Sequence, residues 1–207
     1  KRWRQEMIKK NTKMKWAVLI FLVLIASLLT WRIYYVNQNV PKVQTEYYDE
    51  NDSVSMDRGT GDETDTKLKN YIVKVESTQL MDKDEFDKKY KYTSAEETNE
   101  KNDAYYLVTV NIENKNKEDD NSFGVSLYSV LLLKENGYII LDEDAFKAVN
   151  PEMPGTSFAL RGSSNMTMTL VYGLNEENGT KVKDGKVEYL KGLMVTETPV
   201  RKIIRLE

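Results

Sequence analysis

The spacing of hydrophobic positions changes twice along the chain. An apolar run covers residues 16–31 and continues through residues 33–36 after a single arginine. Residues 37–66 are polar and acidic without a sustained period, and from residue 68 onward apolar residues recur at alternate positions. These three patterns are typical of a membrane-spanning helix, a flexible segment and a set of β-strands, respectively. The sequence therefore predicts three parts with different structures.

The first apolar run is long enough to cross a lipid bilayer. As a helix, residues 16–36 would be about 31 Å long, which matches a hydrocarbon core of about 30 Å. Five side chains are typical of the two membrane interfaces: Trp16 at one end, and Trp31, Arg32, Tyr34 and Tyr35 at the other. A cleaved signal peptide would have a shorter apolar region and two small residues before the cut, and every candidate pair here contains a bulky residue. We therefore predict one retained transmembrane helix.

Charge is distributed unequally on the two sides of this run. Residues 1–15 hold seven Lys or Arg and one Glu, whereas residues 36–207 hold 22 basic and 32 acidic residues. Because basic residues beside a span favour the cytoplasmic side, we predict a cytoplasmic basic tail over residues 1–15 and a C-terminal domain outside the cell membrane. The tail is expected either simply to extend the helix or also to bind anionic lipid, with each Lys or Arg adding about 1 kcal/mol.

The polar stretch over residues 37–66 predicts a flexible tether, because it cannot bury enough apolar surface to offset its ordering entropy. The alternating segments after it, separated by turn clusters such as "NPEMPG", predict about eight strands within residues 67–207. The predicted strands are residues 71–77, 105–115, 122–133, 138–141, 157–160, 165–173, 186–195 and 200–206. In an acidic insert over residues 82–103, charge pairs four residues apart predict a helix over residues 84–90. This pattern predicts an all-β fold, a β-sandwich, with a closed barrel as the alternative.

Several of these segments resemble a known family in their order. "YYLVTVNIENKNKED", "LLLKENGYIIL", "NPEMPGTSFAL" and "MTMTLVYGL" follow one another as in telokin-like immunoglobulin-fold domains of unknown function from Gram-positive membrane-anchored proteins and lipoproteins. The resemblance covers residues 68–206 and implies an immunoglobulin-like sandwich. It also implies that Asn114-Lys115 begins a turn and that Pro154-Gly155 opens a strand. The chain departs from the family by its acidic insert and its helical anchor, and the family implies no catalytic residues.

The available residue types favour binding over catalysis. The chain has no His and no Cys, which removes imidazole bases, thiol nucleophiles and disulfide bonds. It has neither a Ser-x-x-Lys motif nor a glycine-rich phosphate loop that opens a helix. Acidic clusters at residues 82–87 and 142–146 lack the EF-hand pattern, so we expect capping or solvated roles for them and no metal or cofactor. The acidic domain should repel nucleic acid.

These observations predict a non-enzymatic, single-pass membrane protein with an extracytoplasmic interaction module. We expect a protein partner in or at the membrane. The chain would then be an accessory subunit of a bacterial membrane complex, of transporter or secretion type, or a surface sensor. The alternative is an extracytoplasmic hydrolase that uses the clustered carboxylates.

The segment around "ENG" at residues 135–137 yields a specific hypothesis about the binding surface. The Asn-Gly pair predicts a two-residue turn that pairs Leu133 with Ile140. In that register alternate residues from Phe123 to Leu133 face the core. Apolar side chains then remain on the opposite face: Tyr128, Val130, Leu132, Ile139 and Leu141.

Such a patch of about a few hundred Å² would be a candidate partner-docking face. The alternative is that the chain covers these side chains itself, through the residue 84–90 helix or the crossover at residues 144–156, or that a bulge shifts the register. Burial of Val130, Leu132 and Leu141 would exclude docking at this face.

Overall fold

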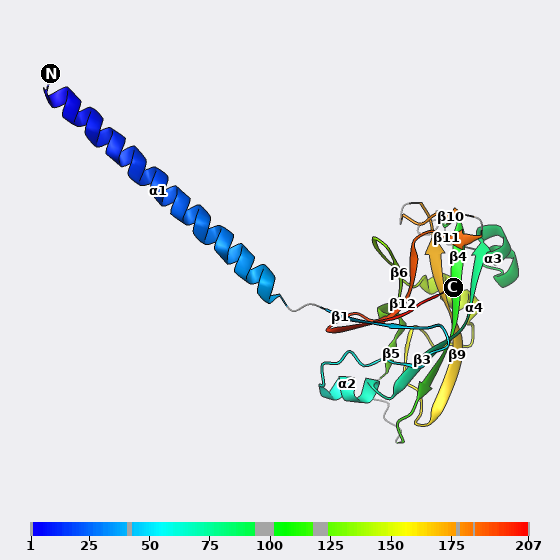
Figure 1. Ribbon diagram of the computed structural model, residues 1–207. Coiled ribbons are helices and arrows are strands. Elements are labelled where there is room, and N and C mark those ends of the chain that lie inside the picture. Colours follow the sequence, from blue (N-terminus) through cyan, green and yellow to red (C-terminus); the bar gives the residue numbers. More distant parts are fainter. Residues whose placement is uncertain are drawn as a thin grey trace. The chain divides into compact units, whose positions relative to one another are not determined.

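A long helix and a β-rich domain make up the chain (Figure 1). They are separate units, residues 1–42 and residues 43–207. The structure, a computed structural model, describes residues 2–40, 43–93, 102–117, 124–176, 179–183 and 185–206. Residues 94–101 of the predicted insert and Phe123, which was expected to face the core, lie outside the described residues.

The N-terminal unit is a single helix, α1 (Arg2–Asn39). Its segment Met14–Asn39 is long and apolar enough to cross a membrane. The Ser27 and Thr30 hydroxyls donate hydrogen bonds to main-chain carbonyl oxygens one turn earlier, at 2.8 and 2.9 Å, which satisfies both hydroxyls in an apolar environment. The expected apolar anchor is therefore present. The helix continues through residue 15, so no structural break separates the predicted tail from the predicted span.

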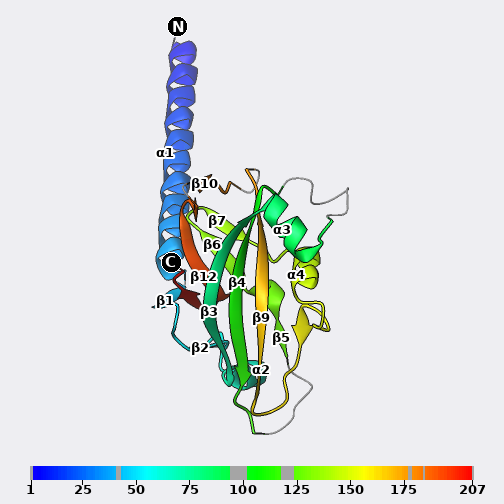
Figure 2. The ribbon, with the colours of Figure 1, turned by 90° about the vertical axis from the view of Figure 1, so that its right-hand side faces the viewer.

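One face of the domain is a four-stranded antiparallel sheet (Figure 2). Its strands, in spatial order, are β2 (Val54–Ser55), β3 (Tyr71–Asp82), β4 (Ala104–Asn114) and β9 (Ser164–Leu174). Along each long strand, alternate side chains such as Val73, Val108 and Leu170 enter the core. This is the two-residue period of the sequence, and it sets the register of β3, β4 and β9.

The opposing sheet has five strands. They are, in spatial order, β1 (Gln44–Tyr48), β13 (Val200–Ile204), β12 (Leu190–Thr196), β6 (Leu131–Lys134) and β7 (Gly137–Ile139). β1 is parallel to β13, and the other pairs are antiparallel. A row of paired residues crosses all five strands and packs on the core: Tyr48, Ile204, Leu193, Leu132 and Ile139. The predicted β-sandwich is confirmed.

Shorter elements surround the two sheets. β5 (Val125–Ser126) pairs with β8 (Ser157–Phe158), and β10 (Val182–Lys183) pairs with β11 (Lys186–Val187). The helices are α2 (Glu63–Leu68), α3 (Lys83–Tyr90) and α4 (Glu143–Val149), and a 3₁₀ turn spans Leu127–Ser129. The helix expected at residues 84–90 is α3. The strand expected at residues 122–133 is instead divided into β5, the 3₁₀ turn and β6.

The expected tether over residues 37–66 is replaced by structure. Residues 44–48 form β1, which pairs with β13 along its whole length, and β2 and α2 follow. Val54 and Met56 are buried in the core. The local sequence is polar because β1 is an edge strand with exposed side chains, and the strand that stabilises it lies at the far end of the chain. The β-rich domain therefore begins at residue 43 and not at residue 67.

The predicted docking face lies inside the domain. Lys134 pairs with Gly137, so Glu135 and Asn136 form the turn, one residue earlier than predicted, and Leu133 pairs with Tyr138 instead of Ile140. Four of the five side chains are buried in the core: Val130, Leu132, Ile139 and Leu141. A shift of one residue moves every side chain of a strand to the other face, and the 3₁₀ turn also interrupts the alternation. The hypothesis of docking at this face is wrong, and only Tyr128 of the five is exposed.

Candidate functional site

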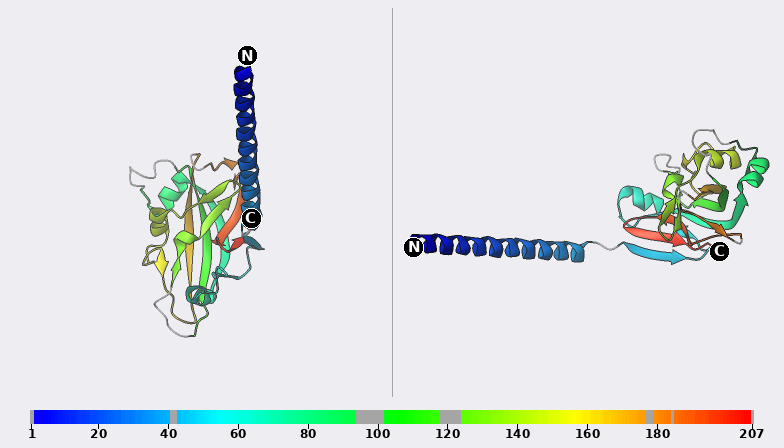
Figure 3. Two further views of the ribbon diagram at one scale, coloured as in Figure 1. Left: turned by 90° about the vertical axis from the view of Figure 1, so that its left-hand side faces the viewer. Right: turned by 90° about the horizontal axis from the view of Figure 1, so that it is seen from above.

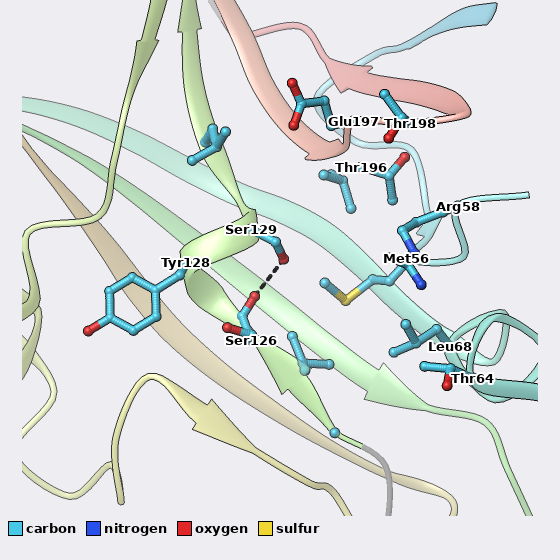
Figure 4. Close-up of a pocket in the computed structure, with 14 residues that line it drawn as sticks. Met56, Arg58, Thr64, Leu68, Ser126, Tyr128, Ser129, Thr196, Glu197 and Thr198 are labelled. Carbon is cyan, nitrogen blue, oxygen red and sulfur yellow. Dashed lines mark hydrogen bonds between the residues drawn. The ribbon is translucent and has the colours of Figure 1, made fainter. Parts of the chain in front are cut away.

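A cleft opens in the domain between three segments of the chain (Figure 4). They are residues 56–68, which include α2, residues 124–131 around β5 and the 3₁₀ turn, and residues 195–198 at the end of β12. The cavity volume is about 420 Å³. This value falls within the range of about 300–1,000 Å³ that is common for ligand pockets.

The cleft has an apolar floor and a polar rim. The floor consists of buried side chains from all three segments: Met56, Val125, Leu131 and Val195. Figure 4 shows the side chain of Met56, the residue that directly follows β2, extending toward Ser126 and Ser129. The exposed rim residues are Arg58, Thr64, Ser126, Tyr128, Ser129, Glu197 and Thr198. Because the rim carries one cation and one carboxylate, its charged side chains give it no net charge.

The cleft exists because β6 ends before its neighbour β12. Their pairing stops at Leu131 and Met194, so the next pair in register would be Val130 with Val195. The Val130 N–H instead donates to the Leu127 carbonyl oxygen at 3.0 Å, and the Val130 carbonyl oxygen accepts a hydrogen bond from the Tyr172 hydroxyl at 3.0 Å. The last residues of β12 therefore extend beyond β6 and line the cleft.

Contacts with β8 hold the other wall away from β12. β5 pairs with β8, and the Leu127 N–H donates to the Thr156 carbonyl oxygen at 2.8 Å. Gly124 permits this approach, since a Cβ atom there would lie 2.3 Å from the Phe158 carbonyl oxygen. Residues 124–127 are thus positioned by β8 and its flanking loop. This leaves the cleft between residues 124–127 and the end of β12.

A buried lysine fixes the segment that carries Met56. The Lys202 ammonium donates to the Asp57 carboxylate at 2.8 Å, to the Asp57 carbonyl oxygen at 2.9 Å and to the Ser55 carbonyl oxygen at 3.0 Å. Three acceptors satisfy all three ammonium protons, which a buried cation requires. The Val200 N–H also donates to the Arg58 carbonyl oxygen at 3.2 Å. Hydrogen bonds to β13 therefore hold residues 55–58, which form one wall of the cleft, in place.

Each acidic cluster singled out in the sequence begins with the N-cap residue of a helix. Asp82 accepts a hydrogen bond from the Glu85 N–H at 2.8 Å at the start of α3, and Asp142 accepts one from the Ala145 N–H at 3.0 Å at the start of α4. Burial raises the pKa of the Asp142 carboxyl, while the bond from Ala145 opposes that rise. Among the residues that the structure describes, no group of three acidic side chains is placed to hold a metal ion.

The site residues expected from the sequence are distributed over both units. The five residues predicted for the membrane interfaces lie on α1, where the Trp31 and Tyr35 rings stack with centroids 5.7 Å apart. Tyr128 is at the cleft rim, and its hydroxyl donates to the Glu143 carboxylate. Sequence reasoning missed Met56 and Arg58 because they fell in the predicted tether over residues 37–66. The alternation of Val54 and Met56 was the available signal.

Comparison with known proteins identifies a family for most of the chain. A family described as a domain of unknown function (DUF5028) matches residues 45–202. The match begins in β1 and ends in β13, the two parallel neighbours in the five-stranded sheet. It includes all three segments around the cleft. No curated protein and no solved structure matches the chain.

Proposed function

For this chain, which belongs to the DUF5028 family, we propose the function of a membrane-anchored interaction module that binds a protein partner through the cleft. The observation that supports this role is the cleft beside the end of β12, with its apolar floor and polar rim. The cleft belongs to a domain joined to an apolar helix long enough to cross a membrane. These two features together suit the binding of a partner next to a membrane.

The distribution of charge supports a location of the domain outside the cytoplasm. Basic residues are concentrated before the apolar helix, and acidic residues predominate after it. We propose that the chain serves as an accessory subunit of a bacterial membrane complex of transporter or secretion type, or as a surface sensor. Both roles need a folded binding domain on one span and neither needs catalytic residues.

The composition of the cleft also favours binding over hydrolysis. The lining contains a single carboxylate, that of Glu197, whereas glycoside hydrolysis by carboxyl groups uses two that flank one bond. The clustered acids considered for a hydrolase include Asp82 and Asp142, which cap α3 and α4. A pocket of mostly apolar and hydroxyl side chains fits recognition of a neutral ligand surface.

Site-specific photo-crosslinking in living cells tests this proposal. A benzophenone amino acid is introduced at Thr64 or Thr198 on the cleft rim, and at the exposed Thr167 on the outer face of the four-stranded sheet as control. We expect a discrete adduct from both rim positions, none from Thr167, and loss of the adduct when Ser126→Trp fills the cleft. Equal adducts from all three positions, or none from the rim, would contradict binding in the cleft.

The location of the domain has a simple independent test. Because the chain has no Cys, an Asn165→Cys variant carries a single thiol on an exposed strand position. We expect a membrane-impermeant maleimide to label this variant in intact cells. Labelling that occurs only after lysis would place the domain in the cytoplasm and exclude an extracytoplasmic module.

A further inference from the structure

We infer that two copies of the chain pair with each other along β1, so that their five-stranded sheets join into one continuous sheet. The partner at this edge is therefore a second copy of the same chain, related to the first by a twofold axis. β1 contributes no residue to the lining of the cleft, so the inference goes beyond the proposed function and does not depend on it.

β1 is the border strand of its sheet, and in the described part of the chain it pairs with β13 alone (Figure 1). Its side chains are accessible: Tyr47 is 54% exposed, and Val43, just before the strand, is 40% exposed. The ladder with β13 runs in register over all five residues of β1, and the strand contains neither Pro nor Lys. Bulges, Pro and Lys are devices that protect edge strands from pairing, and β1 has none of them.

The main-chain directions show that β1 has hydrogen-bonding groups to offer. The Tyr48 carbonyl oxygen accepts a hydrogen bond from the Arg205 N–H at 2.9 Å, so the main-chain groups of Tyr48 face β13. In a ladder these groups alternate in direction from one residue to the next. The N–H and carbonyl groups of Thr45 and Tyr47 therefore face away from β13, and no hydrogen bond from the described residues reaches them.

The corresponding border of the other sheet is blocked at its centre. The Asn150 side chain donates to the Thr169 carbonyl oxygen of β9 at 2.8 Å and accepts from the Thr169 N–H at 2.9 Å. The Asp142 N–H donates to the Val171 carbonyl oxygen at 2.9 Å. The two capping residues of α4 thus occupy the groups that an added strand would need on β9.

The side chains of β1 favour one antiparallel register. With Thr45 opposite Thr45 of the second copy, Val43 lies opposite Tyr47, which pairs an aliphatic side chain with an aromatic ring. In the same register Gln44 lies opposite Glu46, where the amide can donate to the carboxylate. A register centred on Glu46 would instead place two carboxylates directly opposite each other, which is destabilising.

The apolar helix favours pairing of two copies. Two chains anchored through α1 lie in one membrane and point in the same direction, so they can share a twofold axis normal to that membrane. Confinement to one membrane also raises the effective concentration of each copy for the other. A short interface that would be weak in solution can then hold two copies together.

Cysteine cross-linking of the full chain in membranes tests the pairing, because the chain has no Cys of its own. Cα atoms of a hydrogen-bonded antiparallel pair lie about 5.5 Å apart, which suits a disulfide. After oxidation, Thr45→Cys should give at least about tenfold more linked dimer than the exposed Thr167→Cys of β9. Val43→Cys and Tyr47→Cys should cross-link when the two variants are expressed together, and poorly when each is expressed alone.

Matched proline variants test whether main-chain hydrogen bonds hold the pair. Thr45→Pro removes an N–H that faces away from β13, and Thr167→Pro removes one that faces away from β4, so neither should change the unfolding midpoint. Energy transfer between purified full chains, labelled at Asn51→Cys and reconstituted in phosphatidylcholine vesicles, measures association without any other protein. Thr45→Pro should lower the association constant at least about tenfold, because each pair loses two hydrogen bonds, and Thr167→Pro should leave it unchanged.

Three results would overturn the inference. The first is a dimer yield from Thr45→Cys no greater than that from Thr167→Cys. The second is equal yields from Val43→Cys, Thr45→Cys and Tyr47→Cys, each alone, which would indicate a parallel or random contact. The third is association that survives Thr45→Pro or is absent from vesicles of purified chain. If Thr45→Pro does not fold, the cysteine yields decide. Cross-linking from the cleft rim is independent of all three results.

Discussion

The two ends of the sandwich are covered to different extents. β3 runs between them, with α2 before its first residue and α3 after its last (Figure 3). At the α3 end, α3 lies against β3 and β4 and α4 lies against β9, and buried aromatic rings fill the space beneath them. Phe86 of α3 stacks on Tyr105 of β4 with ring centroids 4.0 Å apart. At the α2 end the cleft remains open.

The two ends of the sandwich differ because the segments that connect the strands there have different side chains and turns. The acidic insert after β3 carries Phe86, Tyr90 and Tyr92, and these rings pack on one another and on Tyr105. Side chains therefore close that end. At the other end the 3₁₀ turn precedes β6, the pairing of β6 with β12 stops at Leu131 and Met194, and the cleft lies beside the end of β12. We therefore expect the α3 end to contribute stability and the α2 end to contribute binding.

The largest expected effect comes from the core that both ends share. Leu132 is fully buried in the middle of the five-stranded sheet, so Leu132→Asp places a carboxylate in the apolar core and leaves a cavity beside it. We expect loss of cooperative unfolding of the domain, measured by near-ultraviolet circular dichroism during denaturation. Ile140→Asp is the control, because Ile140 is 60% exposed and its variant should change the unfolding free energy by less than about 0.5 kcal/mol. If Leu132→Asp left the unfolding free energy unchanged and Ile140→Asp lowered it strongly, the docking face predicted from the sequence would be supported.

Phe86→Ala should test whether the α3 end is stabilising. Removal of a buried phenylalanine typically costs about 3–5 kcal/mol, and Phe86 contacts three tyrosine rings. We expect a loss of this size in denaturant unfolding, with cross-linking from the cleft rim preserved under conditions where the variant is folded. Lys88→Ala on the exposed side of α3 is the matched control. A loss below about 1 kcal/mol would show that the aromatic cluster does not seal the domain.

A smaller effect concerns Asp142, the cap of α4. Burial raises the pKa of its carboxyl in the folded domain above the unfolded value of about 3.9. The folded state then binds a proton more readily than the unfolded state, so this group destabilises the domain at neutral pH and does so less as the pH falls through the folded pKa. Relative to Asp142→Asn, the wild-type domain should gain unfolding free energy between pH 7 and pH 4. A difference that stays constant with pH would contradict this assignment.

The sequence was most informative where structure depends on near neighbours. The alternation in β3, β4 and β9 predicted long strands, because one face of each is buried along the whole length. The charge pairs four residues apart within residues 84–90 predicted α3. The apolar run predicted α1. In each case the residues that determine the element lie within it or next to it.

The elements that the sequence did not predict depend on contacts between distant segments. β1 looked like a tether because its partner β13 lies at the end of the chain. The cleft depends on the 3₁₀ turn, and that turn leaves Val130 bonded to Tyr172 of β9. The hairpin register depended on which two residues of "ENG" formed the turn, and a single position separated a core strand from an apparent docking face. None of these contacts has a local signature.

The smallest expected effect on stability, and the one that isolates the α2 end, comes from filling the cleft. Ser126 is exposed on the cleft wall, and its hydroxyl has only a weak contact with Ser157 at 3.4 Å, so Ser126→Trp should change the unfolding free energy by less than about 0.5 kcal/mol. The indole should nevertheless exclude a ligand, because it occupies space beside Met56 and Val125. Ser126→Ala removes the hydroxyl without adding volume and should bind normally. A stability loss above about 1 kcal/mol for Ser126→Trp would mean that the cleft behaves as packed core, and the contrast between the two ends would fail.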